Sequence, residues 1–251
     1  MHNGRVAIAG VLLGLALATT ARAASPVLFL DRCADGCAYT PGFDDSRTNA
    51  SSIPSASSTL SAYAFGDASF DAVVACVHDT FAPFAIAVTD VDPGASAHFE
   101  IAVAGAPQQL GLPAGVTNVS PTSCQNDGVI ANGLGFAFAG AIGDAPLEIC
   151  WNAAQAAGAL LGLDHEVLAG DVMTYLGGSL PKAFLDETAP CGETQARDCR
   201  CGGTTQNSHQ RLLTSLPEPG AIGGVLVAVA ALSTLARRRR VASPPERGAE
   251  R

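Results

Sequence analysis

Apolar residues recur along the middle of the chain with two different periods, which predict alternating strands and helices. Residues 27–31 (VLFLD) are a short apolar run typical of a strand. Residues 40–61 are rich in Ser, Thr, Asn and Gly, have neither period and predict a loop. A helix from Ser69 to the residue before Pro83 is predicted next, because apolar side chains recur there at helical spacing: Phe70, Val73, Val74, Val77 and Phe81.

The second half of the chain first changes to a period of two. Residues 85–91, 98–105 and 128–140 predict strands, the last one loosened by glycines. A long helix rich in Ala and Leu is predicted from Ala145 or Pro146 to Leu161, ending at Gly162. A shorter helix is predicted near residues 205–216. Together these elements predict an α+β domain whose helices pack on a mainly one-sided sheet.

Composition and charge limit the kind of protein and its partners. Of the 251 residues, 48% are hydrophobic and only 15% are charged, which excludes a disordered or fibrous chain. Between Ser25 and Pro219 there are 6 basic and 21 acidic residues, a balance of 15 negative charges. Such a surface would repel phosphates, so nucleic acid is excluded as a partner.

The first 23 residues have the pattern of a secretory signal peptide. A short polar start with Arg5 precedes an apolar run from Val6 to Ala18, and Ala21-Arg22-Ala23 matches an A-x-A cleavage site. Signal peptidase is therefore a transient partner, and residues 24–216 are expected to form the exported domain.

A second addressing segment is predicted at residues 217–240. It begins with Pro217, Glu218 and Pro219, continues with a 16-residue apolar run, and ends with four arginines: Arg237, Arg238, Arg239 and Arg240. A helix of 16 residues covers about 24 Å, less than the roughly 30 Å of a hydrocarbon core. An ordinary single-span anchor is the alternative, with the arginines kept in the cytoplasm.

The three parts in this order resemble the PEP-CTERM sorting signal of Gram-negative bacteria. The resemblance implies that an exosortase removes the segment after a transient stay in the inner membrane. The protein would then reach the cell surface or the extracellular matrix, and residues 241–251 would be a disordered basic and polar tail.

Eight cysteines lie within the exported part, at positions 33, 37, 76, 124, 150, 191, 199 and 201. An even number in an oxidising compartment predicts disulfides, but eight cysteines allow about 105 pairings. The alternative is zinc binding by Cys33 and Cys37, or by the cluster of Cys191, Cys199 and Cys201.

Residues 155–175 (QAAGALLGLDHEVLAGDVMTY) resemble the metzincin zinc peptidases, particularly the matrixin-like branch. That family has the pattern H-E-x-x-H-x-x-G-x-x-H followed by a methionine turn. The three histidines bind zinc, and the glutamate is the general base for the zinc-bound water. Gly162 matches the family glycine, His165 matches the third ligand, and Met173 matches the methionine turn. The resemblance is close over residues 155–175, looser over 26–176, and implies a zincin sheet with an active-site-type helix and a small C-terminal subdomain.

The same register places residues without metal-binding chemistry at the other decisive positions. Gln155 lies at the first ligand, Ala156 at the general base and Ala159 at the second ligand. Alanine has no donor atom, and an amide oxygen is a weak zinc ligand. His165 alone would be a vestigial metal ligand, so no catalytic residue and no cofactor is predicted. If the register does not hold, Gly162 and His165 belong to an ordinary helix end, and Met173 is a core residue.

Other candidate ligands have simpler explanations. His78 and His98 are single histidines expected to be structural or exposed. Asp90, Asp92 and Glu100 flank an Asp-Pro-Gly turn, with weak calcium binding as the alternative. Carboxylates near His165 could replace lost zinc ligands, but their spacing does not support it: Asp164, Glu166 and Asp171.

The sequence thus predicts an exported, exosortase-sorted protein with a catalytically degenerate metzincin-like domain that acts in binding or structure. An envelope polypeptide or exopolysaccharide is the expected contact. Two alternatives stay open. One is an active zinc-dependent endopeptidase with atypical ligands, and the other is a disulfide-stapled structural matrix protein.

Overall fold

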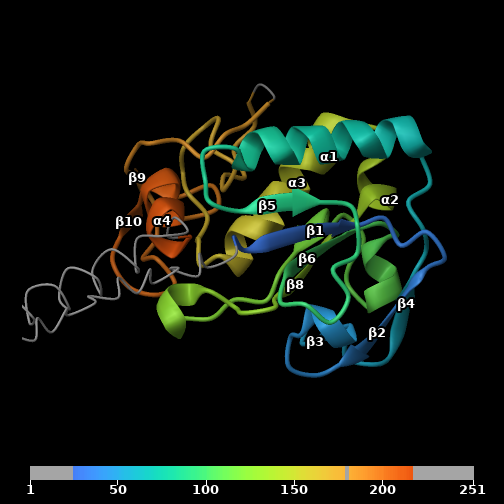
Figure 1. The fold of residues 1–251 in the computed structure, drawn as a ribbon. Helices are drawn as coiled ribbons and strands as arrows, with labels where there is room; N and C mark the ends of the chain where they lie inside the picture. The colour runs from blue at the N-terminus through green and yellow to red at the C-terminus, as the bar shows by residue number, and fades with distance from the viewer. Residues whose placement is uncertain (1–24, 179–180, 217–251) are drawn as a thin grey trace, which may run out of the picture. The chain divides into compact units, whose positions relative to one another are not determined.

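The computed structural model describes residues 25–178 and 181–216 (Figure 1). The predicted signal peptide, the sorting residues Pro217 to Pro219 and Arg237 to Arg240, and the tail all lie outside the described residues. The described domain is a mixed α+β structure, as the sequence predicted.

A five-stranded sheet forms the centre of the domain, in the order β5-β1-β6-β8-β7. Its strands are β1 (Val27–Asp31), β5 (Ala87–Thr89), β6 (Phe99–Val103), β7 (Asn118–Val119) and β8 (Leu134–Ala137). Neighbouring strands are parallel except for β7, which pairs antiparallel with β8 at one edge. The outer side of β7 pairs with no other strand in the described part of the chain.

Two long helices, α1 (Asp67–Phe81) and α3 (Pro146–Leu160), cover one face of this sheet (Figure 1). Side chains that alternate along the strands meet the apolar stripes of both helices. The resulting core includes fully buried side chains from four elements: Leu28, Leu30, Ile101, Val73, Val77, Ile149 and Leu160. Both helices agree with the predicted ones to within about two residues at each end.

The opposite face of the sheet is also covered, so the expectation of a mainly one-sided sheet was wrong. Residues 40–61, predicted as loop, contribute to a second sheet of order β3-β2-β4, made of β2 (Cys37–Pro41), β3 (Ala50–Ser51) and β4 (Ser58–Leu60), with the 3-10 turn η1 (Ser46–Thr48). Tyr39 and Leu60 pack there against Phe136 and Phe138. Strands of two to five residues are too short for a period to emerge from a Ser- and Asn-rich stretch.

Several smaller elements follow or interrupt the segments that were predicted as strands. Residues 107–110 and 126–128 form the 3-10 turns η2 (Pro107–Leu110) and η3 (Asn126–Gly128). The predicted strand 128–140 is a strand only over β8, and α2 (Ala139–Ile142) follows it. Asp127 and Gly128 have positive φ angles of 55° and 88°, which a strand cannot accommodate.

The residues after α3 pack on the same core. They form β9 (Ala189–Pro190), β10 (Thr205–Gln206) and α4 (Ser208–Ser215), whose N-cap Asn207 accepts from the Gln210 backbone N–H at 2.9 Å. The predicted helix therefore begins three residues later than expected. Phe184, Leu212 and Leu216 join the cluster that contains α1 and α3, so the small C-terminal part has no separate core within the described residues.

All eight cysteines form disulfides, which confirms that prediction and contradicts the zinc-cluster alternative for them. The pairs are Cys33–Cys37, Cys76–Cys150, Cys124–Cys201 and Cys191–Cys199. Cys76–Cys150 joins α1 to α3, and the last two pairs fix the segment before α4. Four disulfides are consistent with an exported protein.

One basic side chain is buried beside α3. The Lys182 ammonium lies 3.6 Å from the centre of the Trp151 ring and donates to the Leu176 carbonyl oxygen at 2.9 Å. Lys182 is only 6% exposed, and burial lowers its pKa.

Within the described ranges, no helix has the length and apolar character needed to cross a membrane.

Candidate functional site

The C-terminal end of α3 organises the candidate site. Pro146 starts the helix, where its missing N–H costs nothing, and Gly162 lies just beyond its end with φ of 90°. A Cβ at Gly162 would lie 2.5 Å from the Asp127 carbonyl oxygen, so both the backbone angle and the close approach require glycine. The chain then turns back and brings Asp164 and His165 beside the helix.

Gln155 is a buried amide whose hydrogen-bonding groups are engaged. Its Nε2 donates to the carbonyl oxygens of Val172 at 2.9 Å and Thr174 at 3.1 Å. Its Oε1 accepts from Nδ2 of Asn118 at 2.9 Å, and the same Nδ2 donates to Asn152 Oδ1 at 2.7 Å. The side chain at the predicted first zinc ligand therefore ties α3 to the edge strand β7 and to residues 172–174.

The two alanines at the other degenerate positions differ in burial. Ala156 is buried, and its carbonyl oxygen accepts from the Ser120 hydroxyl at 2.8 Å. Ala159 is half-buried and lines a cavity. Neither methyl group can bind a metal or accept a proton.

Met173 lies beneath α3, where its side chain is fully buried. The helix passes so closely that a Cβ at Gly158 would lie 2.7 Å from the Met173 sulfur. Asp171 holds the turn from both sides, because Oδ1 accepts from the Met173 backbone N–H at 2.6 Å and Oδ2 accepts from the Ser208 hydroxyl at 2.6 Å. The segment around Met173 thus packs against α3 at Gly158 and Gln155.

His165 is partly exposed and held on two sides. Its Nδ1 lies 3.2 Å from Glu193 Oε1, and its ring centre lies 4.4 Å from that of Tyr175. A carboxylate can only accept, so Nδ1 carries the proton and Nε2 is the free ring nitrogen. The side-chain exposure of His165 is 17%, which leaves it open to the cavity.

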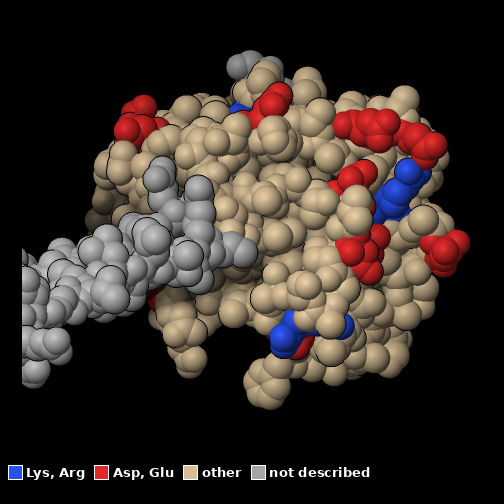
Figure 2. Space-filling view, viewed as in Figure 1, with Lys and Arg blue, Asp and Glu red and all other residues tan. Residues whose placement is uncertain are grey.

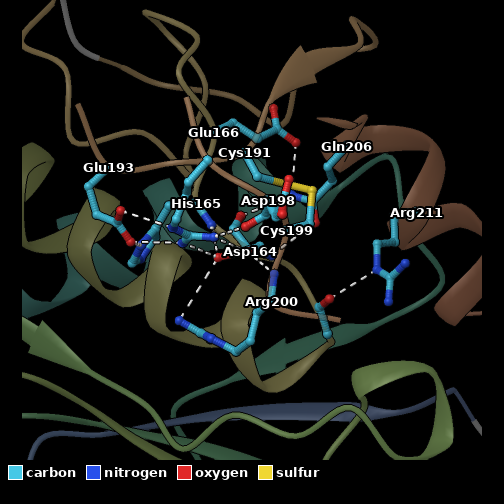
Figure 3. The surroundings of a disulfide bond; sticks show 12 residues. Asp164, His165, Glu166, Cys191, Glu193, Asp198, Cys199, Arg200, Gln206 and Arg211 are labelled. Atoms are coloured by element: carbon cyan, nitrogen blue, oxygen red, sulfur yellow. Dashed lines mark hydrogen bonds and ion pairs between the residues drawn. A yellow bond between two sulfur atoms is a disulfide. The ribbon is translucent and has the colours of Figure 1, made fainter. Parts of the chain in front are cut away.

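An ion-pair network fixes the residues around His165 (Figure 3). Arg197 donates to both oxygens of Asp164 at 2.7 Å and to Glu193 Oε1 at 2.8 Å. The Asp164 carboxylate also accepts the backbone N–H groups of His165 at 2.8 Å and Arg200 at 2.7 Å. These donors hold the pKa of Asp164 well below its usual range, and Arg197 lowers that of Glu193 to about 2.

A cavity of about 190 Å³ is lined by Gln155, Ala159 and His165, the three residues matched to the zinc ligands of the metzincin pattern. Its wall carries polar groups from β7, from α3 and from the residues that follow them: Asn118, Ser120, Thr122, Gln155, Asp164, His165, Tyr175 and Arg200. The cavity adjoins a larger hollow of about 530 Å³ between the end of α3 and α4. The site is therefore a polar recess beside His165.

The donor atoms of this recess do not fit a zinc ion. His165 supplies one ring nitrogen, and the two nearest carboxylates, Asp164 and Glu193, are already bound to Arg197. Elsewhere in the described residues, groups of three His, Cys, Asp or Glu with ligand atoms close together occur only beside disulfides: Asp31 with Cys33 and Cys37, and Asp164 with Cys191 and Cys199. Their sulfurs are bonded to each other and cannot act as thiolates.

The other carboxylates considered as replacement ligands are also used elsewhere. Glu166 is fully buried and accepts from Gln206 Nε2 at 2.9 Å (Figure 3). Asp171 is committed to its turn. Neither one lies on the wall of the cavity around His165.

The remaining predicted candidates lie apart from this recess. His78 is exposed beside Asp79. His98 is buried, with Nε2 3.6 Å from Glu100 Oε2, and Asp92 accepts from the Gly94 backbone N–H. Asp92 thus closes its own turn, as Asx residues do.

Sequence reasoning missed Asn118, Tyr175 and Arg200 as parts of the site. Tyr175 follows Met173 by two residues, and that spacing was the only local signal. Asn118 and Arg200 are 37 and 45 positions away from Gln155 along the chain, and only the folded sheet and the disulfides bring them close.

The chain was compared with protein-family models, with curated proteins and with solved structures. None of the three comparisons found a match. The geometry of the site therefore carries the functional argument.

Proposed function

We propose that this protein is exported and sorted to the cell surface or matrix of a Gram-negative bacterium by an exosortase. Its central domain is metzincin-like in fold and catalytically degenerate. It binds a polypeptide or an exopolysaccharide of the envelope instead of hydrolysing a peptide bond.

The order of elements supports the metzincin-like part of the proposal. Strand β1, helix α1, the strands β5 to β8 and the long helix α3 follow one another as the resemblance implies. Gly162 ends the helix, His165 faces the cavity beside Gln155, and Met173 lies beneath both. His165 lines the recess together with Gln155 and Ala159, which are matched to the first and second ligand positions, and this supports the proposed register.

The hydrogen bonding of the Gln155 side chain is the single observation that most supports a loss of catalysis. Its amide hydrogens and its oxygen serve the 172–174 segment and Asn118, so this side chain has a structural role at the position of the first ligand. Among the described residues, His165 is the only imidazole on the wall of the recess, and both oxygens of the Asp164 carboxylate there accept from Arg197.

Two alternatives make different demands. An active zinc endopeptidase with atypical ligands would need groups to replace two missing zinc ligands and the general base, while Asp164 and Glu193 are held by Arg197. A disulfide-stapled structural matrix protein would need no recess, so the cavity around His165 would have no role.

Zinc content tests the proposal directly. The exported domain, purified without chelator and dialysed against zinc, should hold well under one zinc ion per chain and should not cleave casein. One tightly held zinc per chain, lost in His165→Ala, would favour the active peptidase.

A gain-of-function variant tests the fold part of the proposal. The triple replacement Gln155→His, Ala156→Glu and Ala159→His should restore zinc binding, because it places two imidazoles one helical turn apart opposite His165. The same triple replacement combined with His165→Ala is the matched control and should bind zinc more weakly. Overpacking of about 1–3 kcal/mol is the expected cost to stability.

A further inference from the structure

The recess around His165 is one end of a longer groove. Three hollows follow the segment 121–131, with volumes of about 190, 530 and 340 Å³. Thr122 lines all three, and Ser123 is shared by the second and third. The hollows therefore adjoin one another, and we call the whole the 121–131 groove.

Exposed aromatic rings mark both ends of the groove. Phe43, on the wall of the third hollow, is 98% exposed. Tyr175, on the wall of the first, is 46% exposed. A large apolar side chain left in water forgoes about 1.5–3 kcal/mol of burial, so two such rings on one groove indicate a surface that another molecule covers.

The wall between the rings offers hydrogen bonds. The hydroxyl groups of Thr122 and Thr205 are on the wall of the central hollow and form no hydrogen bond with other described side chains. The guanidinium group of Arg200 lies 3.9 Å from Asp164 Oδ1, beyond hydrogen-bond distance. Arg211 is fixed in place because it donates to the carbonyl oxygens of Gly162 at 2.9 Å and Asp127 at 2.7 Å (Figure 3 labels Arg200 and Arg211). These groups suit a ligand with many hydroxyls.

Charge favours an uncharged ligand. Two arginines, Arg200 and Arg211, and two carboxylates, Asp127 and Asp164, line the central hollow, so their formal charges cancel. The domain around it is strongly acidic, and the face in Figure 2 has more carboxylates than basic groups. Such a domain repels polyanions at a distance.

The geometry points to a neutral polysaccharide as the ligand of the 121–131 groove, a proposal that rests on the binding function proposed above. Sugar rings stack their C–H faces on Phe43 and Tyr175, and their hydroxyls bond to Thr122, Thr205 and Arg200. An extended peptide is less well served, because the open edge strand β7 is only two residues long and offers little main-chain pairing.

Affinity gel electrophoresis of the mature domain tests this ligand. The gels contain dextran, hydroxyethyl cellulose or galactomannan, and parallel gels contain polygalacturonate. At least one neutral polymer should retard the wild type. Phe43→Ala and Tyr175→Ala should each raise the apparent Kd about tenfold, and Val91→Ala, which removes an exposed apolar side chain outside the groove, should not change it.

Three results would overturn the proposal. One is the absence of retardation by every neutral polymer, with the domain folded by circular dichroism. Another is retardation that the double variant Phe43→Ala/Tyr175→Ala leaves unchanged. The third is stronger binding to polygalacturonate or to unfolded casein that depends on the same two rings. In each case, absence of zinc and of casein cleavage would leave the proposed function standing.

Discussion

At the scale of single residues, Gln155 connects three parts of the chain that are distant in sequence. Its amide forms hydrogen bonds with Asn118, Val172 and Thr174. Removing a buried amide of this kind costs more stability than the net value of its hydrogen bonds, because its buried partners are left without a partner.

Gln155→Ala should therefore lower the free energy of unfolding by about 3 kcal/mol, because it removes the side-chain donor of the buried Thr174 carbonyl oxygen and one partner of Asn118 and opens a small void. Urea unfolding measures the change. Gln108→Ala removes an exposed glutamine of η2 and should change stability by less than about 0.5 kcal/mol. Equal effects of both substitutions would contradict the structural role of Gln155.

Glu166 gives the domain a dependence on pH. Burial and the nearby Asp171 carboxylate raise the pKa of Glu166 to about 8. When folding raises the pKa of a carboxyl group, its contribution to the free energy of unfolding is fully present below the pKa of the unfolded state, about 4.5 here. This contribution is lost as the pH rises towards 8.

Glu166→Gln should consequently gain stability relative to the wild type between pH 5 and pH 8. Glutamine stays neutral and keeps an oxygen that accepts from Gln206. The groups with lowered pKa values, Asp164 and Glu193, lose their protons below this window and do not obscure it. Thermal unfolding of both proteins at pH 5, 6.5 and 8 is the measurement, and a difference that does not vary with pH would refute this role.

At the scale of elements, length decides what the sequence could predict. Helix α3 was predicted almost to the residue, because a 15-residue apolar pattern with Pro146 and Gly162 at its ends leaves little choice. Strand β7 has two residues and no period, so it could not be found, although it carries the Asn118 side chain that meets Gln155. The same limit applies to β2, β3 and β4.

Residues 155–175 supply part of the wall of the recess, but the rest of the wall depends on long-range pairing. The groups that engage Gln155 and border His165 come from β7 and from the disulfide-bonded segment around Cys199. A sequence pattern within one helix and one turn cannot specify partners that the sheet order and the disulfides supply.

The disulfide between α1 and α3 should stabilise the fold more than the short disulfide between Cys33 and Cys37. Cys76–Cys150 closes a loop of 74 residues, whereas Cys33–Cys37 spans only 4. In the chain-entropy account, the longer loop gives about 2.5 kcal/mol more stabilisation. Urea unfolding of Cys76→Ala/Cys150→Ala and of Cys33→Ala/Cys37→Ala compares the two, and a larger loss for the second pair would count against this account.

At the scale of the whole molecule, a sheet covered on both faces explains how a chain with few charged residues forms a single core. The cluster beneath α1 and α3 and the cluster beneath β2 and β4 share the central strands. The groove lies where the segments after β7 and after α3 meet, and Leu163 of the first cluster lines it.

The proposed sorting step concerns the full-length chain. We expect an epitope tag placed after Arg251 to be lost from the surface form in cells with an exosortase, because the apolar run ends near Ala236 after only 16 residues. Immunoblots of surface fractions measure this. A variant with alanines in place of Arg237 to Arg240 is expected to keep the tag. Wild-type protein that retains the tag at the surface would favour a plain anchor.

The chain contains a single lysine, Lys182, and its ammonium lies against Trp151 with only 6% of the residue exposed. Amine-selective reagents should therefore label the folded mature protein at its α-amino group alone. Labelling of Lys182 requires the contact with Trp151 to open, so its rate reports the local unfolding of the segment beside α3. Immobilisation through amines would likewise attach every molecule by one end, in one orientation.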